Sequence, residues 1–405
     1  MTSNTSSGRQ ATFRREGAVL MLGSSLTIVG AVMVAPILPK LFMEFGPIEP
    51  RADILVPLAI TGPALTIALF APLAGWLADR MGRKALLILA TILYAFFGAM
   101  PALLESLTGI VSSRLLFGCA EAAIMTCCAA LIADYWQGEQ RMKMVNFQVV
   151  TIGLMGALFF VIGGALGEKA WRAPFYLYLL PLVLVPFMAR ILWEPASVRR
   201  QQVERGDDRI SVGTLVVGYL LIFCGMLLNF IVPVQTPVLL VEMGVTSSTL
   251  IGASAGLGLL TSLAGALLWP VVRKTVGIAG CNALLLSLVA LGLWLLSRAE
   301  SYNEVLFAVA LHGVGAGLLV PNAMAPVMNA LSADTRGRGL GAFTSFLYLG
   351  QFASPLLIAM LGGFRFDLRG AIELLAVLSL VGGAIWVVTA ILTPRTATGV
   401  ARTNA

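Results

Sequence analysis

Three ionisable side chains lie inside long apolar segments of this sequence, at Arg114, Glu121 and His312. Glu121 follows Arg114 by seven residues, so on one α-helix the two lie on the same face, two turns and about 10 Å apart. An arginine stays charged and can hold an anion or a nearby carboxylate, and a carboxylate can exchange that partner for a proton or a cationic ligand. The pair therefore indicates either binding and proton coupling or a structural ion pair.

His312 is the only histidine in the chain. It lies about 10 Å inside an apolar helix, and imidazole titrates near neutral pH, which suits a proton relay. In the glycine-rich stretch 311–317 it can equally be a hydrogen-bonded packing residue. Three uncharged polar residues in other apolar segments are further candidates for a solute cavity: Asn229, Gln235 and Asn322.

A ten-residue stretch between two apolar segments carries four charges. It reads Gly-Trp-Leu-Ala-Asp-Arg-Met-Gly-Arg-Lys, and its informative positions are Gly75, Asp79, Arg80, Gly82, Arg83 and Lys84. So short a stretch forms only a tight hairpin, in which glycine allows the turn and close helix approach. A carboxylate there can face the positive end of another helix. The stretch therefore predicts a junction between helices.

Parts of this pattern occur a second time in the chain. Gly265, Leu267, Arg273 and Lys274 repeat it at identical spacing 190 residues later, with Trp269 in place of Asp79. Likewise, the segment 130–134 (Ala-Leu-Ile-Ala-Asp) matches 330–334 (Ala-Leu-Ser-Ala-Asp). A loop that occurs twice indicates two homologous halves.

The elements that position these residues are membrane-spanning helices. Hydrophobic residues make up 58% of the chain and charged residues 12%, whereas a soluble domain is about 25% charged. Stretches of about 20 apolar residues, enough to cross about 30 Å of hydrocarbon, recur along the chain. We predict an all-α polytopic membrane protein with two pseudo-symmetric six-helix halves, 1–193 and 213–405, joined by a charged linker, 194–212. The predicted spans are 17–39, 54–77, 85–104, 108–133, 144–166, 173–193, 213–236, 249–271, 278–297, 305–331, 340–362 and 371–392.

Positive charge is unevenly distributed between the two sides of this arrangement. With a cytoplasmic N-terminus, 19 of the 27 Lys and Arg residues fall in cytoplasmic segments and seven in external ones. The positive-inside rule then places both termini in the cytoplasm. The net charge of +7 therefore indicates topology and contact with anionic lipid, and not nucleic-acid binding.

The sequence argues against several other classes of protein. It has no Gly-x4-Gly-Lys-Ser/Thr loop and no inserted soluble domain, so we expect a gradient and not a nucleotide as the energy source. Its five cysteines fall in predicted helices, without zinc-site or disulfide spacing. Paired acids and histidine clusters are missing, so we expect no enzyme, no cofactor, no metal and no obligate protein partner.

The stretch 75–84 resembles the signature loop between the second and third helices of the major facilitator superfamily, whose members have twelve helices in two halves. The resemblance implies that Asp79 meets the N-terminus of the eleventh helix, near 337–341. It also implies that Arg83 pairs with Asp134 at the end of the fourth helix. These contacts would join the halves on the cytoplasmic side in the outward-open state.

Arg114 and Gly118 resemble a second superfamily pattern, which is linked in proton-coupled members to proton transfer. The motifs are closest to those of the drug:proton antiporter branch. The fifth helix, however, has the glycines Gly153, Gly156, Gly163 and Gly164 without the Gly-Pro that this branch usually carries there.

The resemblance implies a secondary active transporter that works by alternating access. We expect proton-coupled efflux of small organic or drug-like solutes, with the proton on Glu121 and His312 as a second candidate. The alternative is proton-coupled uptake of a small metabolite or organic anion held by Arg114, and a non-transporting receptor or scaffold is a remote third. The partners are then the solute, protons and the lipid bilayer, and short loops favour a bacterial inner membrane.

Overall fold

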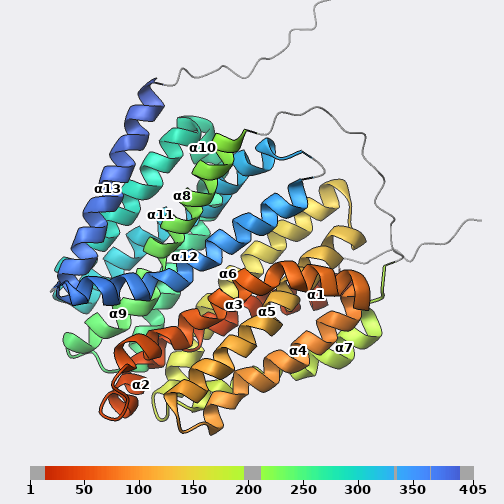
Figure 1. The fold of residues 1–405 in the computed structure, drawn as a ribbon, viewed down its shortest axis with the longest axis horizontal. Helices are drawn as coiled ribbons and strands as arrows, with labels where there is room; N and C mark the ends of the chain where they lie inside the picture. Colours follow the sequence, from red (N-terminus) through yellow and green to blue (C-terminus); the bar gives the residue numbers. More distant parts are fainter. Residues whose placement is uncertain (1–13, 196–210, 333–334, 365, 393–405) are drawn as a thin grey trace, which may run out of the picture.

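The computed structural model describes residues 14–195, 211–332, 335–364 and 366–392. Within these ranges every regular element is a helix (Figure 1). The α-helices and the 3-10 helices (η) are, in chain order, α1 (Arg15–Val32), η1 (Ala35–Ile37), α2 (Leu38–Phe45), α3 (Ala52–Met81), α4 (Arg83–Ala99), η2 (Met100–Leu103), α5 (Leu107–Tyr135), α6 (Gly138–Gly167), η3 (Ala173–Val183), α7 (Leu184–Ile191), α8 (Val212–Asn229), α9 (Ile231–Glu242), α10 (Ser248–Arg298), α11 (Tyr302–Ala330), α12 (Arg336–Gly363) and α13 (Leu368–Leu392).

Eleven helical stretches in the described residues are long and apolar enough to span a membrane, and one of them accounts for two crossings. The element α10 has 51 residues, about 75 Å at 1.5 Å per residue, which is more than twice the thickness of the hydrocarbon. Inside it Gly277, at φ 73° and ψ −174°, is non-helical and separates 248–276 from 278–298. Glycine adopts a positive φ at little cost. The predicted all-α fold with twelve membrane-spanning helices is therefore confirmed.

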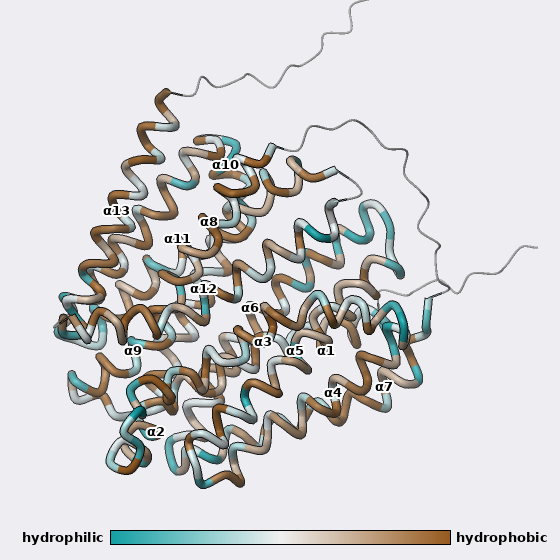
Figure 2. The backbone as a smooth tube through the Cα atoms, viewed as in Figure 1, coloured by the Kyte–Doolittle hydropathy of each residue, from teal (hydrophilic) through white to brown (hydrophobic). Residues whose placement is uncertain are grey.

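The helices form two groups, each around its own buried core (Figure 1). Leu20 and Phe117 belong to a core formed by α1–α7 together with Val234 of α9, and Ile222 and Leu293 belong to the core within α8–α13. Hydrophobic residues follow the helices, and hydrophilic residues gather toward their ends (Figure 2). The division at residues 193 and 213 stays a prediction, because most of the linker, 196–210, lies outside the described residues.

Large apolar side chains are exposed on the outer helices. Phe96 of α4, Val183 of η3, Phe187 of α7 and Ile391 of α13 are each more than half exposed. An exposed apolar surface of this extent needs an apolar partner, and in a membrane-spanning bundle the lipid chains provide it. These residues lie in the third, sixth and twelfth predicted spans, which thus have the character of lipid-facing helices.

Two membrane-spanning segments, predicted as continuous helices, are broken in the structure. The first segment stops at Val32 and continues through η1 into α2, and the seventh stops at Asn229 before α9. Proline has no N–H for the carbonyl four residues earlier, so Pro36 and Pro233 each deprive one carbonyl, that of Val32 or Asn229, of its helical partner. The two prolines are related by nearly the spacing of the sequence repeat, so each half is broken at an equivalent place.

We call the side of the bundle where α7 ends and α8 begins the linker end, and the opposite side the far end. Toward the far end, α6 packs closely on the first part of α10. A Cβ added to Gly164 would lie 2.3 Å from the carbonyl oxygen of Ser248, and one added to Gly252 would lie 2.3 Å from that of Phe160. Only glycine allows backbones to approach so closely. The two halves are therefore in direct backbone contact along this seam.

Gly164→Val should destabilise the protein by separating α6 from α10, because overpacking a tight contact costs about 1–3 kcal/mol. Gly362→Val is the matched control, since nothing lies within 4 Å of a Cβ at that position. Thermal unfolding of the purified variants, monitored by the loss of the monodisperse peak in size-exclusion chromatography, should give a midpoint temperature below that of the parent protein for Gly164→Val but not for Gly362→Val. Equal midpoints would contradict the close seam.

Candidate functional site

Arg114 is fully buried in α5 and joins three helices of the first half. Its Nε donates a hydrogen bond to the carbonyl of Ala59 in α3 at 3.1 Å, and its Nη2 donates to the carbonyl of Gly30 in α1. The guanidinium carbon lies 4.2 Å from the ring centroid of Phe117 and 5.4 Å from that of Tyr178. The third nitrogen, Nη1, is buried without a hydrogen-bond partner. Two of the three nitrogens of Arg114 thus donate to protein backbone.

Glu121 lies two turns further along α5 and is 4% exposed. Its Oε2 lies against α1, because a Cβ added to Gly30 would be 2.9 Å from that oxygen. Gly30 therefore contacts Glu121 through its α-carbon and Arg114 through its carbonyl. Among the described residues, no cation comes within ion-pair distance of the Glu121 carboxylate. Arg114 and Glu121 thus both contact Gly30 but do not form an ion pair with each other.

Two tyrosines complete this polar group on α1. The Tyr94 hydroxyl donates to the carbonyl of Leu26 at 2.7 Å, and the Tyr178 hydroxyl donates to that of Gly30 at 2.9 Å. The ring centroids of Tyr94 and Phe117 are 4.3 Å apart. The carbonyls near the break of α1 thus receive side-chain donors from α4, α5 and η3. The sequence analysis did not identify these tyrosines, although a tyrosine inside an apolar segment is a usable signal.

The second half approaches Glu121 through α12. The Tyr348 hydroxyl contacts Sδ of Met125, one helical turn from Glu121, at 3.4 Å. Ser345, one turn earlier, donates to the carbonyl of Ala68 in α3 at 2.8 Å. Glu121 therefore lies near the boundary between the halves, where relative motion would change its surroundings.

His312 and Asn229 lie apart from Arg114 and Glu121, at a central cavity of about 110 Å³. The residues that line it come from α1, α3 and α6 of the first half and from α8, α9, α10 and α11 of the second. His312 is 2% exposed, and its Nε2 has no hydrogen-bond partner. The structure thus places these two predicted residues together at the boundary between the halves.

The other two predicted cavity residues have different surroundings. Gln235 is buried in α9 and does not line the cavity. Asn322 is fully buried within the second half, where its Nδ2 donates to Oδ1 of Asn282 at 2.7 Å and its Oδ1 accepts from Nε1 of Trp269 at 3.1 Å. The Arg273 guanidinium lies 5.1 Å from the Trp269 ring. Asn322 therefore joins α11 to both parts of α10.

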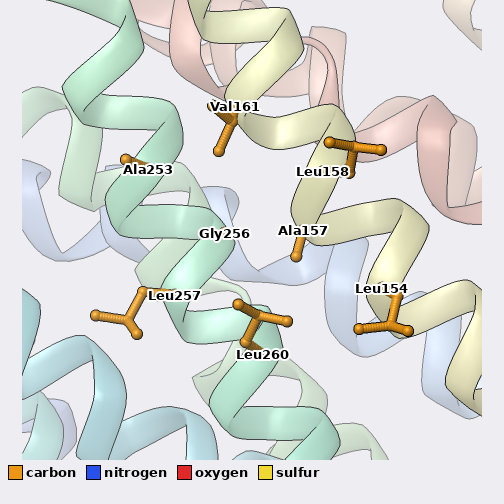
Figure 3. Close-up of a pocket in the computed structure, with 8 residues that line it drawn as sticks. All are labelled: Leu154, Ala157, Leu158, Val161, Ala253, Gly256, Leu257 and Leu260. Carbon is orange, nitrogen blue, oxygen red and sulfur yellow. The ribbon is translucent and has the colours of Figure 1, made fainter.

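A second hollow, of about 350 Å³, lies on the outside of the seam between α6 and α10 (Figure 3). Its lining side chains are all apolar and include Leu154, Leu158 and Leu260. Several of these side chains are half exposed, so the hollow opens where lipid chains would lie. It offers no side-chain group that could orient a polar solute.

The charged stretch 75–84 lies at the linker end. Arg83 is ion-paired with Asp134, and its Nη2 is 4.0 Å from Oδ1 of Asp79. The guanidinium of Arg80 lies 4.1 Å from the Trp76 ring. The structure therefore contains the Arg83–Asp134 pair that the resemblance implies. In the repeated stretch of the second half, Trp269 stands at the position of Asp79 and donates its hydrogen bond to Asn322.

Glu194 adds a contact that the sequence analysis did not identify. Its two carboxylate oxygens accept hydrogen bonds from the backbone N–H groups of Arg83 and Lys84 at 2.7 and 2.9 Å. Nζ of Lys84 donates to the carbonyl of Ala189 at 2.7 Å. A carboxylate at a helix N-terminus satisfies unpaired donors and the helix dipole. The sequence signal that could have indicated this contact is an acidic residue directly after an apolar helix and before Pro195.

Among the described residues, Asp79 makes no hydrogen bond or ion pair with α12. Its side chain is 67% exposed, and nothing lies within 4 Å of a Cβ built on Gly337 or Gly341. Asp334 lies outside the described residues, as does the side chain of Arg336. Among the described residues, the hydrogen bonds and ion pairs of the charged stretch thus join elements of the first half only.

Comparisons with known proteins agree with this geometry. The family model described as Major Facilitator Superfamily matches residues 20–297. The chain belongs to the major facilitator superfamily. Its relatives include the 3-(3-hydroxy-phenyl)propionate transporter of Escherichia coli, 28% identical over 300 residues that cover 70% of this chain and 72% of the relative. They also include the quinolone resistance protein NorA of Staphylococcus aureus, 28% identical over 158 residues, which are 39% of this chain and 40% of NorA.

Solved structures show the same fold. A D-xylose–proton symporter aligns with a TM-score of 0.76 over 93% of this chain and 97% of that one, at 16% identity. The human organic anion transporter MFSD10 aligns with a TM-score of 0.67 over 93% of this chain and 100% of that one, at 20% identity. At such identities the likeness establishes the superfamily fold alone.

In this superfamily member the halves are also joined by polar contacts at the far end. Glu168, just after α6, crosses to the start of α10, where one carboxylate oxygen accepts hydrogen bonds from the backbone N–H and the hydroxyl of Thr249, both at 3.0 Å, and from the Ser247 hydroxyl at 3.2 Å. Nζ of Lys40 donates to the Gly167 and Glu168 carbonyls at 2.6 and 2.5 Å. The hydrogen bond from the Thr249 backbone holds the pKa of Glu168 below its ordinary value.

Acid should weaken this junction. A carboxylate whose pKa is lowered in the joined structure stabilises that structure at pH values above its ordinary pKa of about 4.3, and this contribution is lost as the pH falls through the lowered value. Spin labels at residues 103 and 364, exposed positions in the two halves, should report a longer distance at acid pH.

Glu168→Gln should show the longer distance already at pH 7 and lose most of the pH response. Glu105→Gln, a second exposed acid, is the control and should behave as the parent protein does. A distance that changes with pH to the same extent in both variants would assign the effect to another group.

Proposed function

We propose that this chain is a secondary active transporter that moves small organic solutes by alternating access and couples their export to proton entry. The observation that carries the proposal is Glu121, a buried carboxylate at the boundary between the halves with no cation within ion-pair distance among the described residues. Burying an ionised carboxylate without a partner costs several kcal/mol. Binding a proton removes that cost.

The surroundings of Glu121 support a coupling role. Glu121 contacts Gly30, whose carbonyl is held by Arg114 and Tyr178, so the helix beside the carboxylate is fixed in place. The other side faces α12 of the second half, through Tyr348 and Met125. Movement of α12 would change the solvation of Glu121, and therefore its affinity for a proton, in step with the halves.

The two ends of the bundle support alternating access. The halves are joined at the far end by Glu168 and the glycine seam, whereas Asp79 at the linker end is exposed and makes no hydrogen bond or ion pair with the described side chains of α12. We propose that the linker end is cytoplasmic, from the excess of Lys and Arg there, in a bacterial inner membrane. The structure is then the inward-facing state, and contact between Asp79 and the start of α12 belongs to the outward-facing state.

Export is the first candidate direction, in line with the resemblance of the motifs to drug:proton antiporters and with the relative named as a quinolone resistance protein. Uptake of an organic acid with protons is the second, favoured by similarity to a 3-(3-hydroxy-phenyl)propionate transporter over 70% of the chain. Backbone carbonyls occupy two of the three nitrogens of Arg114, which leaves less of it for a carboxylate. Either direction is solute movement, and we assign no catalytic reaction.

Glu121→Gln should abolish coupled proton movement, because an amide cannot bind and release the proton. Purified protein in liposomes with an internal pH dye should respond to organic cations or organic acids with a proton flux that falls at least about 10-fold in the variant. Glu139→Gln, an exposed acid in the first turn of α6, is the control. Opposite proton and solute movement supports export, and movement in the same direction supports uptake.

An unchanged proton flux in Glu121→Gln would make Glu121 a structural residue. Solute exchange without any proton flux in the parent protein would overturn proton coupling altogether.

A further inference from the structure

The central cavity has the size of a single ring. Its volume is about 110 Å³, on the scale of the apolar cavity of about 150 Å³ that takes up benzene in a well-studied protein. Its walls include Ile28, Ile60 and Phe160 of the first half and Phe230 and Leu259 of the second. A planar, mostly apolar solute would contact both halves at once. This inference rests on the proposed transport function, and names the class of solute.

No charged side chain lines the cavity. The polar side chains among its lining residues are Asn229, Ser262 and His312, and none is Asp, Glu, Lys or Arg. A charged group held there would lose its hydration without gaining an opposite charge, which is costly. Arg114 and Glu121 are outside the lining residues. The cavity therefore favours an uncharged solute.

The backbone at the cavity supplies hydrogen-bond acceptors. Val32 and Asn229, the last residues of α1 and α8, both line it. Their carbonyls are the two that lose helical partners to Pro36 and Pro233. The C-terminal end of a helix also carries partial negative charge. Two such ends beside one cavity disfavour an anion and favour a group that donates a hydrogen bond.

His312 supplies a side-chain hydrogen-bond acceptor at the cavity. His312 lines the cavity, and its Nε2 is buried without a hydrogen-bond partner. A neutral imidazole carries its proton on one nitrogen and accepts a hydrogen bond at the other, and we assign the acceptor role to Nε2. A buried acceptor without a donor is unfavourable, and a solute that brings an O–H or N–H group would satisfy it.

We infer that the central cavity binds a small, uncharged, ring-containing solute that donates one hydrogen bond, of the phenol type, to Nε2 of His312. The ring packs between the two halves, and the hydroxyl selects among apolar molecules of similar size. An organic acid enters the cavity in its uncharged form.

Binding of radiolabelled phenol to the purified protein tests this inference, with unlabelled molecules as competitors. Phenol should compete about 5- to 10-fold better than anisole, its methyl ether, because the ether lacks the donor. Benzoate and benzylammonium should compete more weakly than phenol at pH 7. Replacing Na⁺ by K⁺ or choline should change nothing.

His312→Phe keeps the ring but removes the acceptor, so it should bring phenol and anisole to equal affinity. His312→Gln, which restores an acceptor, should recover part of the preference. Ser254→Ala is the control, because Ser254 is a buried polar residue of α10 that bonds to its own helix and does not line the cavity. Where a His312 variant fails to fold, the comparison of phenol with anisole on the parent protein decides alone.

Three outcomes would overturn the inference: no specific binding of phenol, equal competition by phenol and anisole in the parent, or stronger competition by benzoate. A requirement for Na⁺ would also overturn it and make the broken helices a cation site. Because equilibrium binding needs no transport, Glu121→Gln should still bind phenol. Binding without proton movement would therefore contradict the proposed coupling and leave the cavity assignment intact.

Discussion

The interior of a bilayer contains no water to satisfy a free carbonyl or N–H group. The buried polar contacts of this structure follow from that constraint. Where α1 breaks, side chains of the first half replace the missing helical donors: Arg114 and Tyr178 both donate to the carbonyl of Gly30. The same contacts place Glu121 beside Gly30. The break in α1, the buried Arg114 and the buried Glu121 are therefore connected through their shared contacts with Gly30.

The two halves share a fold but satisfy that constraint with different residues. In the first half, the ion pair between Arg83 and Asp134 holds the linker-end hairpin. In the second half, Trp269 donates a hydrogen bond to Asn322 of α11, and Asp334, the counterpart of Asp134, lies outside the described residues. The charged residues in the interior belong to the first half, and the second half contributes His312. Among the described residues, one half thus carries the buried charges, and the other contributes His312 to the cavity.

Much of the fold could be predicted from the sequence, because apolar runs of spanning length and a repeated charged loop depend only on local composition. The breaks at Val32 and Asn229 could not, since proline often continues within a membrane-spanning helix, as Pro63 does within α3. Arg114 and Glu121 could be placed on one face of a helix, but not their shared contact with Gly30, which depends on how α1 packs. Glu168 lies in a loop without a motif, so only the approach of α6 to α10 reveals its role.

The contacts at the two ends of the bundle differ in kind. At the far end, an exposed carboxylate and a seam of glycines join the halves. Few interdigitated side chains would therefore have to separate when this junction opens. At the linker end, Glu194 and Asp134 hold the hairpin within one half, which leaves Asp79 free to change partners. A rigid hairpin that presents one exposed carboxylate, held among the described residues only by Arg83 at 4.0 Å, can bind the start of a helix in the other half without being rebuilt. Rigidity within each half and weak, replaceable contacts between them allow two states of similar free energy.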